Sequence, residues 1–299
     1  MRIFNFGSLN IDKVYKLEKF VEPEETVIAD SYEETFGGKG LNQSIAISRS
    51  GSDVYHIGVI GKDGKALQEY LLDNNVNVDF MSEVDVANGH AVIQLDKEGQ
   101  NCIIVNKGSN AYLDKSMIDL AMKKVLSDDI VLLQNEVSNI SYILEKAHEK
   151  HAFIAINLSP IDEKLLQSNL EYVDLFILNE LEAGSLAEYY EGNLKLLKNK
   201  LIEKFPKAAF LMTLGGEGSN YFKKDVDIFQ KAFKVDVVDT TGAGDTYCGY
   251  FISNLGKGLQ IEKCMQLASA ASSLAIQKLG ASSSIPYFSE LENFIKNND

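Results

Sequence analysis

The chain has 299 residues, which is long for one hydrophobic core but within the range of a single α/β unit with a small accessory part. Its formal net charge of −14 excludes strong electrostatic attraction to nucleic acid or to an anionic membrane surface. An anionic ligand would therefore have to be held by local backbone donors, a lysine or a metal ion.

Cysteine usage and hydropathy predict a cytoplasmic protein without a membrane partner. The 3 cysteines lie far apart and form no CxxC pair, which favours a reducing compartment over disulfide-bonded secretion. The N-terminal MRIFNFGSLNID lacks the apolar segment of a signal peptide. No apolar run reaches the ~18 residues that a membrane-spanning helix requires.

Short β-rich runs alternate with helical patterns along most of the chain. The strand candidates are, in order, RIFNFGSLN, VYHIGVIG, DIVLLQNE, FIAINLSP, LFILNE and AFLMTLGG. Segments between most of them, such as GLNQSIAISRSG and KSMIDLAMKKVLS, place apolar residues three and four positions apart. This alternation predicts an α/β fold with a mainly parallel sheet covered by helices on both faces. Ligands of such sheets bind beyond the carboxyl ends of the strands.

Two stretches interrupt the alternation. Residues 11–36 alternate polar and apolar side chains without a helical period, and residues 89–107 have the pattern of a strand, a Lys-Glu-Gly turn and a second strand. Both predict a small antiparallel sheet inserted into one domain that spans 1–299. Beside a cleft at the strand ends this sheet could act as a lid. The alternative is a sheet extension without a function.

The segment FKVDVVDTTGAGDTYCGYF combines a glycine-rich turn with a helix start. KVDVVD alternates like a strand, and DTYCGYFISNL has helical spacing. Gly242 and Gly244 allow a close backbone approach, and a helix N-terminus collects free N–H groups that suit a phosphate or a developing oxyanion. Asp245 at this position could accept a proton from a hydroxyl. The simpler alternative is that Asp245 only favours the helix dipole.

A second glycine-rich segment, FGGKGLNQS, also precedes an amphipathic helix. Gly38 lies in the turn, and Lys39 and Asn42 add side-chain donors. Asparagine suits hydroxyl recognition because it offers both a donor and an acceptor. The alternative is a tight turn with a solvated lysine.

Further polar residues follow the predicted strands. Asn10 and Asp12, two positions apart, share one strand face, where they could bind a polyol. Glu136 ends LLQNE, and Asn179 and Glu182 lie at a strand-to-helix corner. The glycine-rich turn in MTLGGEGS could pass close to a nucleotide.

In their order along the chain these segments resemble a known family. GGKGLNQS and DTTGAGDTYCGYF resemble the two signatures of the PfkB carbohydrate kinases. The order NID, GGKGxNQ, QNE, LNELEA, TLGGEG, DTTGAGD and GASSSIP is most similar to the ribokinase branch and covers nearly the whole chain. The resemblance implies a ribokinase-like, Rossmann-like fold and ATP-dependent phosphorylation of a sugar hydroxyl, with D-ribose converted to ribose 5-phosphate.

Several alternatives stay open at this point. Another PfkB-type kinase could act on deoxyribose, a hexose or a nucleoside. A Rossmann-type oxidoreductase is opposed by GAGDTY, which lacks the third glycine of the dinucleotide fingerprint, and the chain has no GxxxxGK[ST] phosphate loop. A non-catalytic sugar-binding protein is opposed by the presence of Asp245.

The resemblance also implies roles for individual residues and a homodimer formed through the lid. Asp245 would be the general base, and the N–H groups of Gly242, Ala243, Gly244 and Asp245 would bind the transferred phosphoryl group. The sugar would be bound by Asn10, Asp12, Gly38, Lys39, Asn42, Glu136 and Asp245. ATP would be bound by Asn179, Thr213, Gly215, Gly216, Gly218, Gly244 and Ser269. Mg²⁺ would be held through water by Glu182. A monovalent cation, K⁺, would be bound by Asp239, Thr241, Ala275, Lys278, Gly280 and Ser284.

Overall fold

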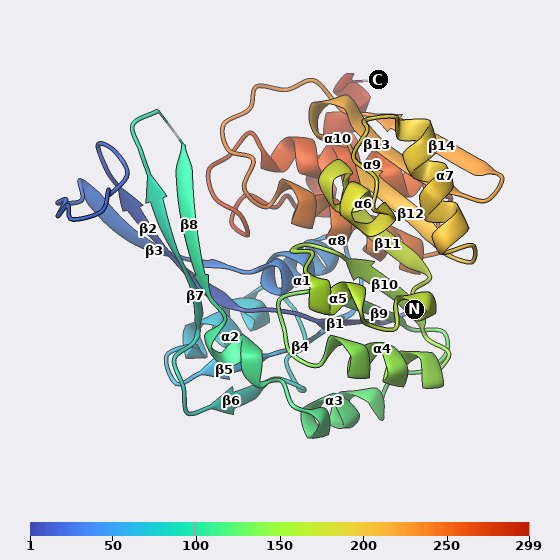
Figure 1. Cartoon of the computed structure of the whole chain (residues 1–299), viewed down its shortest axis with the longest axis horizontal. Coiled ribbons are helices and arrows are strands. Elements are labelled where there is room, and N and C mark those ends of the chain that lie inside the picture. Colours follow the sequence, from blue (N-terminus) through green and yellow to red (C-terminus); the bar gives the residue numbers. More distant parts are fainter. Residues whose placement is uncertain (99, 299) are drawn as a thin grey trace.

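The computed structural model describes residues 1–98 and 100–298. Gly99, in the predicted Lys-Glu-Gly turn, therefore lies outside the described residues. Figure 1 shows helices packed around a central sheet, with a slender second sheet that projects from it.

The central sheet has eight strands in the order β14-β13-β12-β11-β10-β9-β1-β4. The strands from β4 to β12 in this order pair in parallel, whereas β13 is antiparallel to both of its neighbours, β12 and β14. The prediction of a mainly parallel sheet is confirmed. The bounds are β1 (Ile3–Phe6), β4 (Val54–Ile57), β9 (Ile130–Gln134), β10 (Phe153–Asn157), β11 (Leu175–Asn179), β12 (Ala209–Thr213), β13 (Gly218–Lys223) and β14 (Val226–Lys231).

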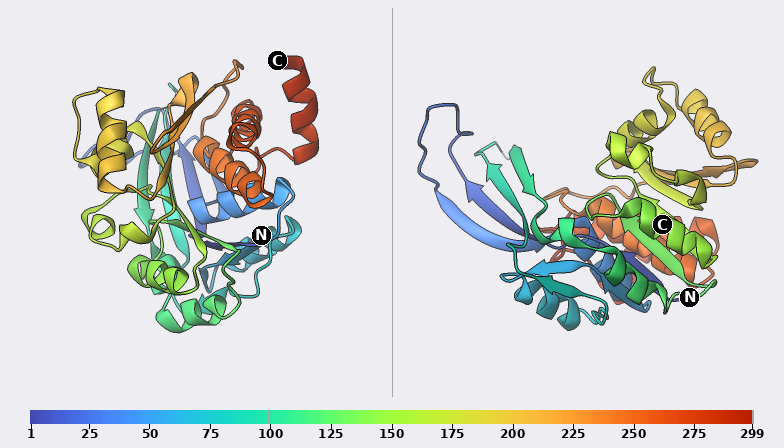
Figure 2. Two further views of the ribbon diagram at one scale, coloured as in Figure 1. Left: turned by 90° about the vertical axis from the view of Figure 1, so that its right-hand side faces the viewer. Right: turned by 60° about the horizontal axis from the view of Figure 1, so that its bottom comes forward.

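Helices cover both faces of this sheet because successive strand residues point to opposite sides. In β9, Ile130 packs into one apolar cluster and Val131 into the other. The face of Val131 is covered by α3 (Lys115–Met122), α4 (Ile140–Glu149), α5 (Glu163–Leu166), α6 (Glu180–Ala187) and α7 (Leu194–Lys204). The face of Ile130 is covered by α1 (Lys39–Arg49), α2 (Lys65–Asp73), α8 (Ala243–Gly256), α9 (Ile261–Ala275) and α10 (Phe288–Asn298). Figure 2 shows this layering from two further sides.

The two stretches that interrupt the alternation supply the second sheet, of four strands. Its order is β3-β2-β7-β8, with β2–β3 and β7–β8 antiparallel and a parallel pairing of β2 with β7 between the hairpins. The bounds are β2 (Asn10–Lys16), β3 (Ser31–Gly37), β7 (Gly89–Leu95) and β8 (Asn101–Asn106). Two short strands, β5 (Val59–Gly61) and β6 (Ser82–Val84), pair separately. The 3-10 helices are η1 (Gly108–Tyr112), η2 (Leu170–Tyr172) and η3 (Gly215–Glu217).

Two local expectations differ from the structure. The predicted strand KVDVVD has no strand pairing, because the N–H groups of Val238 and Asp239 donate to the carbonyl of Ile276 at the end of α9. RIFNFGSLN is divided between two sheets, with the break near Gly7. A Cβ on Gly7 would lie 2.4 Å from the Cα of Gly40, so glycine lets the chain pass directly under the start of α1.

No helix in the described part of the chain combines the length and apolar character needed to cross a membrane.

Candidate active site

The turn before α8 lies at the carboxyl edge of the central sheet. Gly242 has φ 74°, a left-handed conformation that suits glycine, and α8 begins at the next residue. Within the described residues no side chain caps this helix. Because Gly242 and Gly244 line the cleft, the positive end of the helix dipole lies beside it. The N–H of Ala243 donates to the carbonyl of Thr240 at 3.1 Å. Among the N–H groups predicted for the phosphoryl group, this one is already engaged.

Asp245, in the first turn of α8, is 8% exposed and accepts hydrogen bonds on both oxygens. Asn42 Nδ2 donates to Oδ2 and Gln43 Nε2 donates to Oδ1, each at 2.9 Å. Burial raises the pKa of this carboxyl, and Lys39 and the two amide donors oppose the rise. The carboxylate is thus buried, directed by donors and placed beside a cation, as a general base in a cleft requires.

Glu136, just beyond β9, contacts the glycine-rich turn before α1. Its Oε2 accepts from the backbone N–H of Lys39 at 3.1 Å and from the hydroxyl of Ser8. The Lys39 ammonium lies 3.7 Å from Oε1. Gly38 precedes the helix with φ 95°, which explains the glycine at that position.

Asn10 and Asp12 reach the same region from β2. Asn10 Oδ1 accepts from Asn110 Nδ2 at 2.8 Å. A Cβ on Gly37, the partner of Asn10 across the strand pair, would lie 2.0 Å from Asp12 Oδ2, so the carboxyl occupies the space that glycine leaves. Burial, followed by the charge of Glu136, raises the pKa of Asp12 to about 7. The predicted sugar-binding residues therefore converge around one buried, polar end of the cleft.

Two adjoining cavities continue from this polar end and share Thr213 and Gly244 in their linings. The first, of about 190 Å³, contains Asp245 and is lined mainly by polar residues, namely Lys39, Asn157, Ser159, Asn179 and Glu182. The second, of about 590 Å³, is larger and is lined by all the other predicted nucleotide residues, namely Gly215, Gly216, Gly218 and Ser269. The two cavities therefore form one cleft, which runs from the polar end around Asp245 to a larger space of a size that a nucleotide could occupy.

Asn179 and Glu182 form the start of α6. Asn179 Oδ1 accepts from the N–H of Glu182, and Glu182 Oε2 accepts from the N–H of Asn179, each at 2.9 Å. This capping box fixes both side chains at the rim of the smaller cavity. It also gives these two residues, three positions apart at the strand-to-helix corner, a role in starting the helix.

The predicted cation-binding segments meet beside the α8 turn. Asp239 Oδ1 accepts from the N–H and hydroxyl of Thr241 at 2.9 and 2.6 Å, and its Oδ2 accepts from the N–H of Gly280 at 2.9 Å. The other predicted members have separate partners: the Ala275 carbonyl accepts from the N–H of Lys278, the Lys278 ammonium lies 3.3 Å from Glu290, and the Ser284 hydroxyl donates to Ala281. The described residues contain no cluster of three or more His, Cys, Asp or Glu side chains suited to a metal.

Sequence reasoning missed five polar residues of this region: Ser8, Gln43, Asn110, Asn157 and Ser159. Asn157 ends β10, so the rule that ligands bind at strand ends would have found it. Gln43 stands beside Asn42 in the quoted motif, but helical spacing does not show that both amides reach one carboxylate. Asn110 gave no signal, because η1 is far from β2 in sequence.

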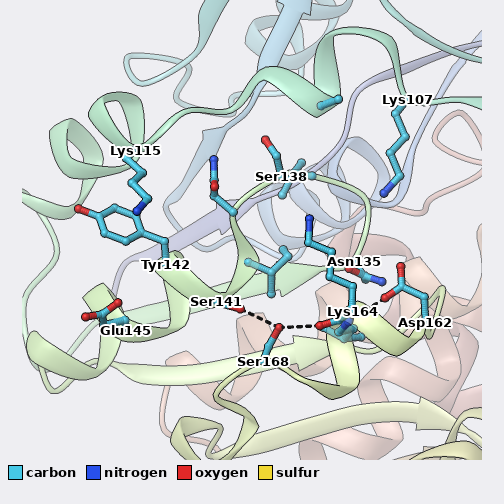
Figure 3. A pocket seen from close by; sticks show the side chains of 15 residues that line it. Lys107, Lys115, Asn135, Ser138, Ser141, Tyr142, Glu145, Asp162, Lys164 and Ser168 are labelled. Carbon is cyan, nitrogen blue, oxygen red and sulfur yellow. Dashed lines mark hydrogen bonds between the residues drawn. The ribbon is translucent and has the colours of Figure 1, made fainter.

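A third cavity, of about 550 Å³, lies where α4 begins, and Figure 3 shows its side chains. Asn135 lines it, while the next residue, Glu136, belongs to the polar end of the cleft. None of the residues predicted for sugar, nucleotide or metal lines this cavity.

Known proteins resemble this chain along nearly its whole length. The family described as pfkB family carbohydrate kinase matches residues 2–287. A ribokinase of Bacillus subtilis is 31% identical over 294 residues, covering 97% of this chain and 97% of the relative. A bifunctional ribokinase/ribose-5-phosphate isomerase A of Fructilactobacillus sanfranciscensis is 34% identical over 304 residues, covering 98% of this chain and 56% of that protein.

Among solved structures, that of Arabidopsis thaliana ribokinase complexed with ribose and ATP superposes with a TM-score of 0.87 at 28% identity. The match covers 99% of this chain and 98% of the other. The predicted ribokinase-like fold is confirmed.

Proposed function

The chain belongs to the pfkB family of carbohydrate kinases, which makes it an ATP-dependent sugar kinase, and on this premise we propose that it converts D-ribose to ribose 5-phosphate. The observation that carries the proposal is the Asp245 carboxylate, buried at the helix N-terminus and held by two amides. The similarity to the Arabidopsis ribokinase, solved with ribose and ATP, supports ribose as the substrate.

In this proposal Asp245 takes the proton of the sugar hydroxyl. The hydroxyl oxygen attacks the terminal phosphorus of ATP, the bond to the bridging oxygen breaks, and ADP leaves with the electron pair. The backbone N–H groups of Gly242, Gly244 and Asp245 and the Lys39 ammonium stabilise the charge on the transferred group, while the N–H of Ala243 keeps its bond to the carbonyl of Thr240. Asn10, Asp12, Asn42 and Glu136 orient the sugar. Because phosphoryl transfer depends on positioning more than on covalent chemistry, these rigid polar contacts suit it.

The nucleotide would occupy the larger cavity, with its phosphates near Gly244. Glu182 fits the Mg²⁺ of the ATP complex, because one carboxylate oxygen, Oε1, forms no hydrogen bond among the described residues and carboxylates are ligands that Mg²⁺ prefers. When bound, Mg²⁺ supplies positive charge to the phosphates. Ser269, in α9, would lie beside the adenine ring of the nucleotide.

A monovalent cation would bind beside the α8 turn. Oxygen atoms suit such an ion, and the Asp239 carboxylate and the Gly280 segment already meet there. The Asp239 carboxylate also links the two segments by itself, so the ion would reinforce an existing contact and thereby steady the turn at Gly242.

We further propose one kinase domain that contains the small sheet as a lid, in a cytoplasmic homodimer. The outer strand β8 exposes Ile103, Ile104 and Val105 by 51%, 62% and 60%, and a second copy of the sheet would cover such an apolar strand. Charge placed there by Ile104→Asp should convert a dimer to a monomer in sedimentation velocity. A wild-type monomer, or a variant that stays dimeric, would remove this part of the proposal.

The substrate assignment is tested by release of ADP with ribose, deoxyribose, fructose, adenosine and pseudouridine. The expected result is the highest kcat/KM for ribose and a product whose phosphate is attached at C5 by ³¹P–¹H NMR. A site built to bind hydroxyls should reject an analogue that lacks one. If another acceptor has a higher kcat/KM, that acceptor would replace ribose as the assigned substrate, and the assignment to the kinase class would stand.

A further inference from the structure

We propose that Gln43 is a positioning residue for Asp245, the end of a buried chain of amides that fixes the orientation of the catalytic carboxylate from inside the fold. The inference rests on the proposed function, in which Asp245 is the general base. It concerns a side chain that contacts neither the sugar nor the nucleotide cavity.

Gln43 is 0% exposed, and its Nε2 lies 2.9 Å from Asp245 Oδ1. An ionised carboxylate only accepts hydrogen bonds, so the amide nitrogen must face it and the amide oxygen must face away. The bond is therefore charge-assisted, and it is closed to water.

The oxygen of Gln43 is fixed in turn from the central sheet. It accepts from Gln134 Nε2, at the end of β9, at 2.7 Å, and Cys248 Sγ lies at 3.4 Å. Gln134 Nε2 also donates to Asn5 Oδ1, in β1, at 2.8 Å. Two adjacent strands thus hold the amide that holds the base.

The chain continues away from the cleft and ends in a neutral group. Asn5 Nδ2 donates to Ser44 Oγ at 2.8 Å and to the Gly40 carbonyl at 2.9 Å. Ser44 Oγ lies 2.9 Å from Nδ1 of His56, and burial lowers the pKa of His56 to about 4. Since Gln43, Gln134, Asn5, Ser44 and His56 are all fully buried, the chain cannot exchange these partners for water.

Close helix packing keeps Gln43 at this distance. A Cβ on Gly249 of α8 would lie 2.4 Å from the Cβ of Ala46 and 2.9 Å from the carbonyl oxygen of Gln43. The glycine lets α1 and α8 approach, so the helix that carries the base and the helix that carries the amide cannot separate without loss of packing.

The two amides that bind Asp245 have different surroundings. Asn42 belongs to the proposed sugar site, and its Oδ1 is buried without a hydrogen-bond partner among the described residues. A sugar hydroxyl bound near Asn42 would compete for the hydrogen bond that Asn42 Nδ2 donates to Asp245 Oδ2. Gln43 has its own partners on the protein side, so its bond to Oδ1 stays, and Oδ2 is left to face the sugar.

The test is Gln43→Met, which keeps the length of the side chain and removes the donor. The expected kcat falls by about 10- to 100-fold, because small displacements of a base are costly. The KM values for ribose and ATP stay within about twofold, since no substrate contact is lost. If Gln43 had only a structural role, the substitution would lower the amount of folded protein but would not lower the kcat of the folded enzyme.

The second readout is the dependence of kcat on pH. Burial raises the pKa of Asp245, and Lys39 together with the amides of Asn42 and Gln43 opposes this, while Glu136 raises it. Cys248, on α8, also faces the carboxylate, with its own pKa raised by burial. Removal of the Gln43 donor should move the acidic limb of the profile to higher pH, because a protonated base is inactive.

Asn254→Leu is the matched control. Asn254 is a fully buried amide of α8 that donates to the carbonyl of Tyr250 at 2.7 Å and to Ser50 Oγ at 3.3 Å, away from Asp245. This variant should lose stability while it keeps the wild-type kcat and pH profile. Equal losses of kcat in both variants would overturn the positioning role.

The remaining outcomes are distinct. If Gln43→Met keeps the wild-type kcat and pH profile while Asp245→Asn is inactive, the positioning proposal fails and the base assignment stands. If Asp245→Asn is itself active, both fail. If Gln43→Met does not fold, Gln134→Met decides: a smaller loss of kcat with the same pH shift supports the chain, and an unchanged profile overturns it.

Discussion

The two ends of the cleft are built differently. At the sugar end, Asp245 is buried and already hydrogen-bonded by Asn42 and Gln43. The nucleotide end is a larger cavity of about 590 Å³, lined by a glycine-rich turn and the helices α8 and α9. In the proposed function the chemical step therefore depends on preset side-chain donors, while nucleotide binding depends on space for close backbone contact.

Two glycines of the nucleotide end differ in whether the fold itself requires them. Gly218 has φ 130°, and a Cβ there would lie 2.1 Å from the carbonyl of Gln230, so the fold itself requires it. A Cβ on Gly216 would meet no atom of the described residues within 4 Å, so the fold leaves room there that a nucleotide can use. Substitutions at the two ends should therefore affect different kinetic constants.

Among the residues proposed to bind substrate, Asp245 apart, the largest effect is expected for Asp12→Ala at the sugar end. In the proposed site a buried hydrogen-bond partner of the sugar is lost, so the KM for ribose should rise about 100-fold. The KM for ATP should stay within a few-fold. Steady-state kinetics with each substrate varied in turn measures both, and equal changes would make Asp12 a structural residue.

Gly216→Ala examines the other end. The free protein has room for the methyl group, whereas a bound nucleotide would contact it, so the KM for ATP should rise about 10-fold. The KM for ribose and the melting temperature should match those of the wild type. A selective change in the ribose KM would contradict the division of the cleft.

Potassium should raise kcat about fivefold, in keeping with typical coupling between neighbouring sites. KCl is titrated against choline chloride at constant ionic strength, without sodium. Asp239→Ala should abolish the saturable response, because that carboxylate joins Thr241 to Gly280. A flat response to KCl would remove the cation site and leave the kinase assignment in place.

The last prediction about the sugar end concerns the stability of the fold. The pKa of Asp12 is raised from 3.8 to about 7 in the folded state, so folding takes up a proton between these values and stability falls as the pH rises through that window. Asn in place of Asp12 avoids this cost. Urea denaturation should show Asp12→Asn gaining stability relative to the wild type by about 2–4 kcal/mol as the pH rises from about 4 to about 7, with no further gain near pH 8. A pH-independent difference would contradict the shift.

Much of the molecule could be predicted because its signals are local. Each parallel strand is a short apolar run, and the polar residues that follow it, such as Glu136, mark the edge where ligands bind. The failures are tertiary. KVDVVD alternates like a strand but bonds to the end of α9, and the amides of Gln43, Gln134 and Asn5 meet across 91 and 129 residues of sequence. No periodicity records such distant contacts.

The central claim is that Asp245 performs the chemistry and not only the capping of α8. The most direct test is the kcat of folded Asp245→Asn with ribose and ATP, with ribose affinity measured in parallel by calorimetry. We predict a kcat lower by about 10²–10⁴-fold, the usual cost of removing a general base, with ribose binding retained. A kcat near that of the wild type would contradict this claim and return Asp245 to the role of a helix-start residue.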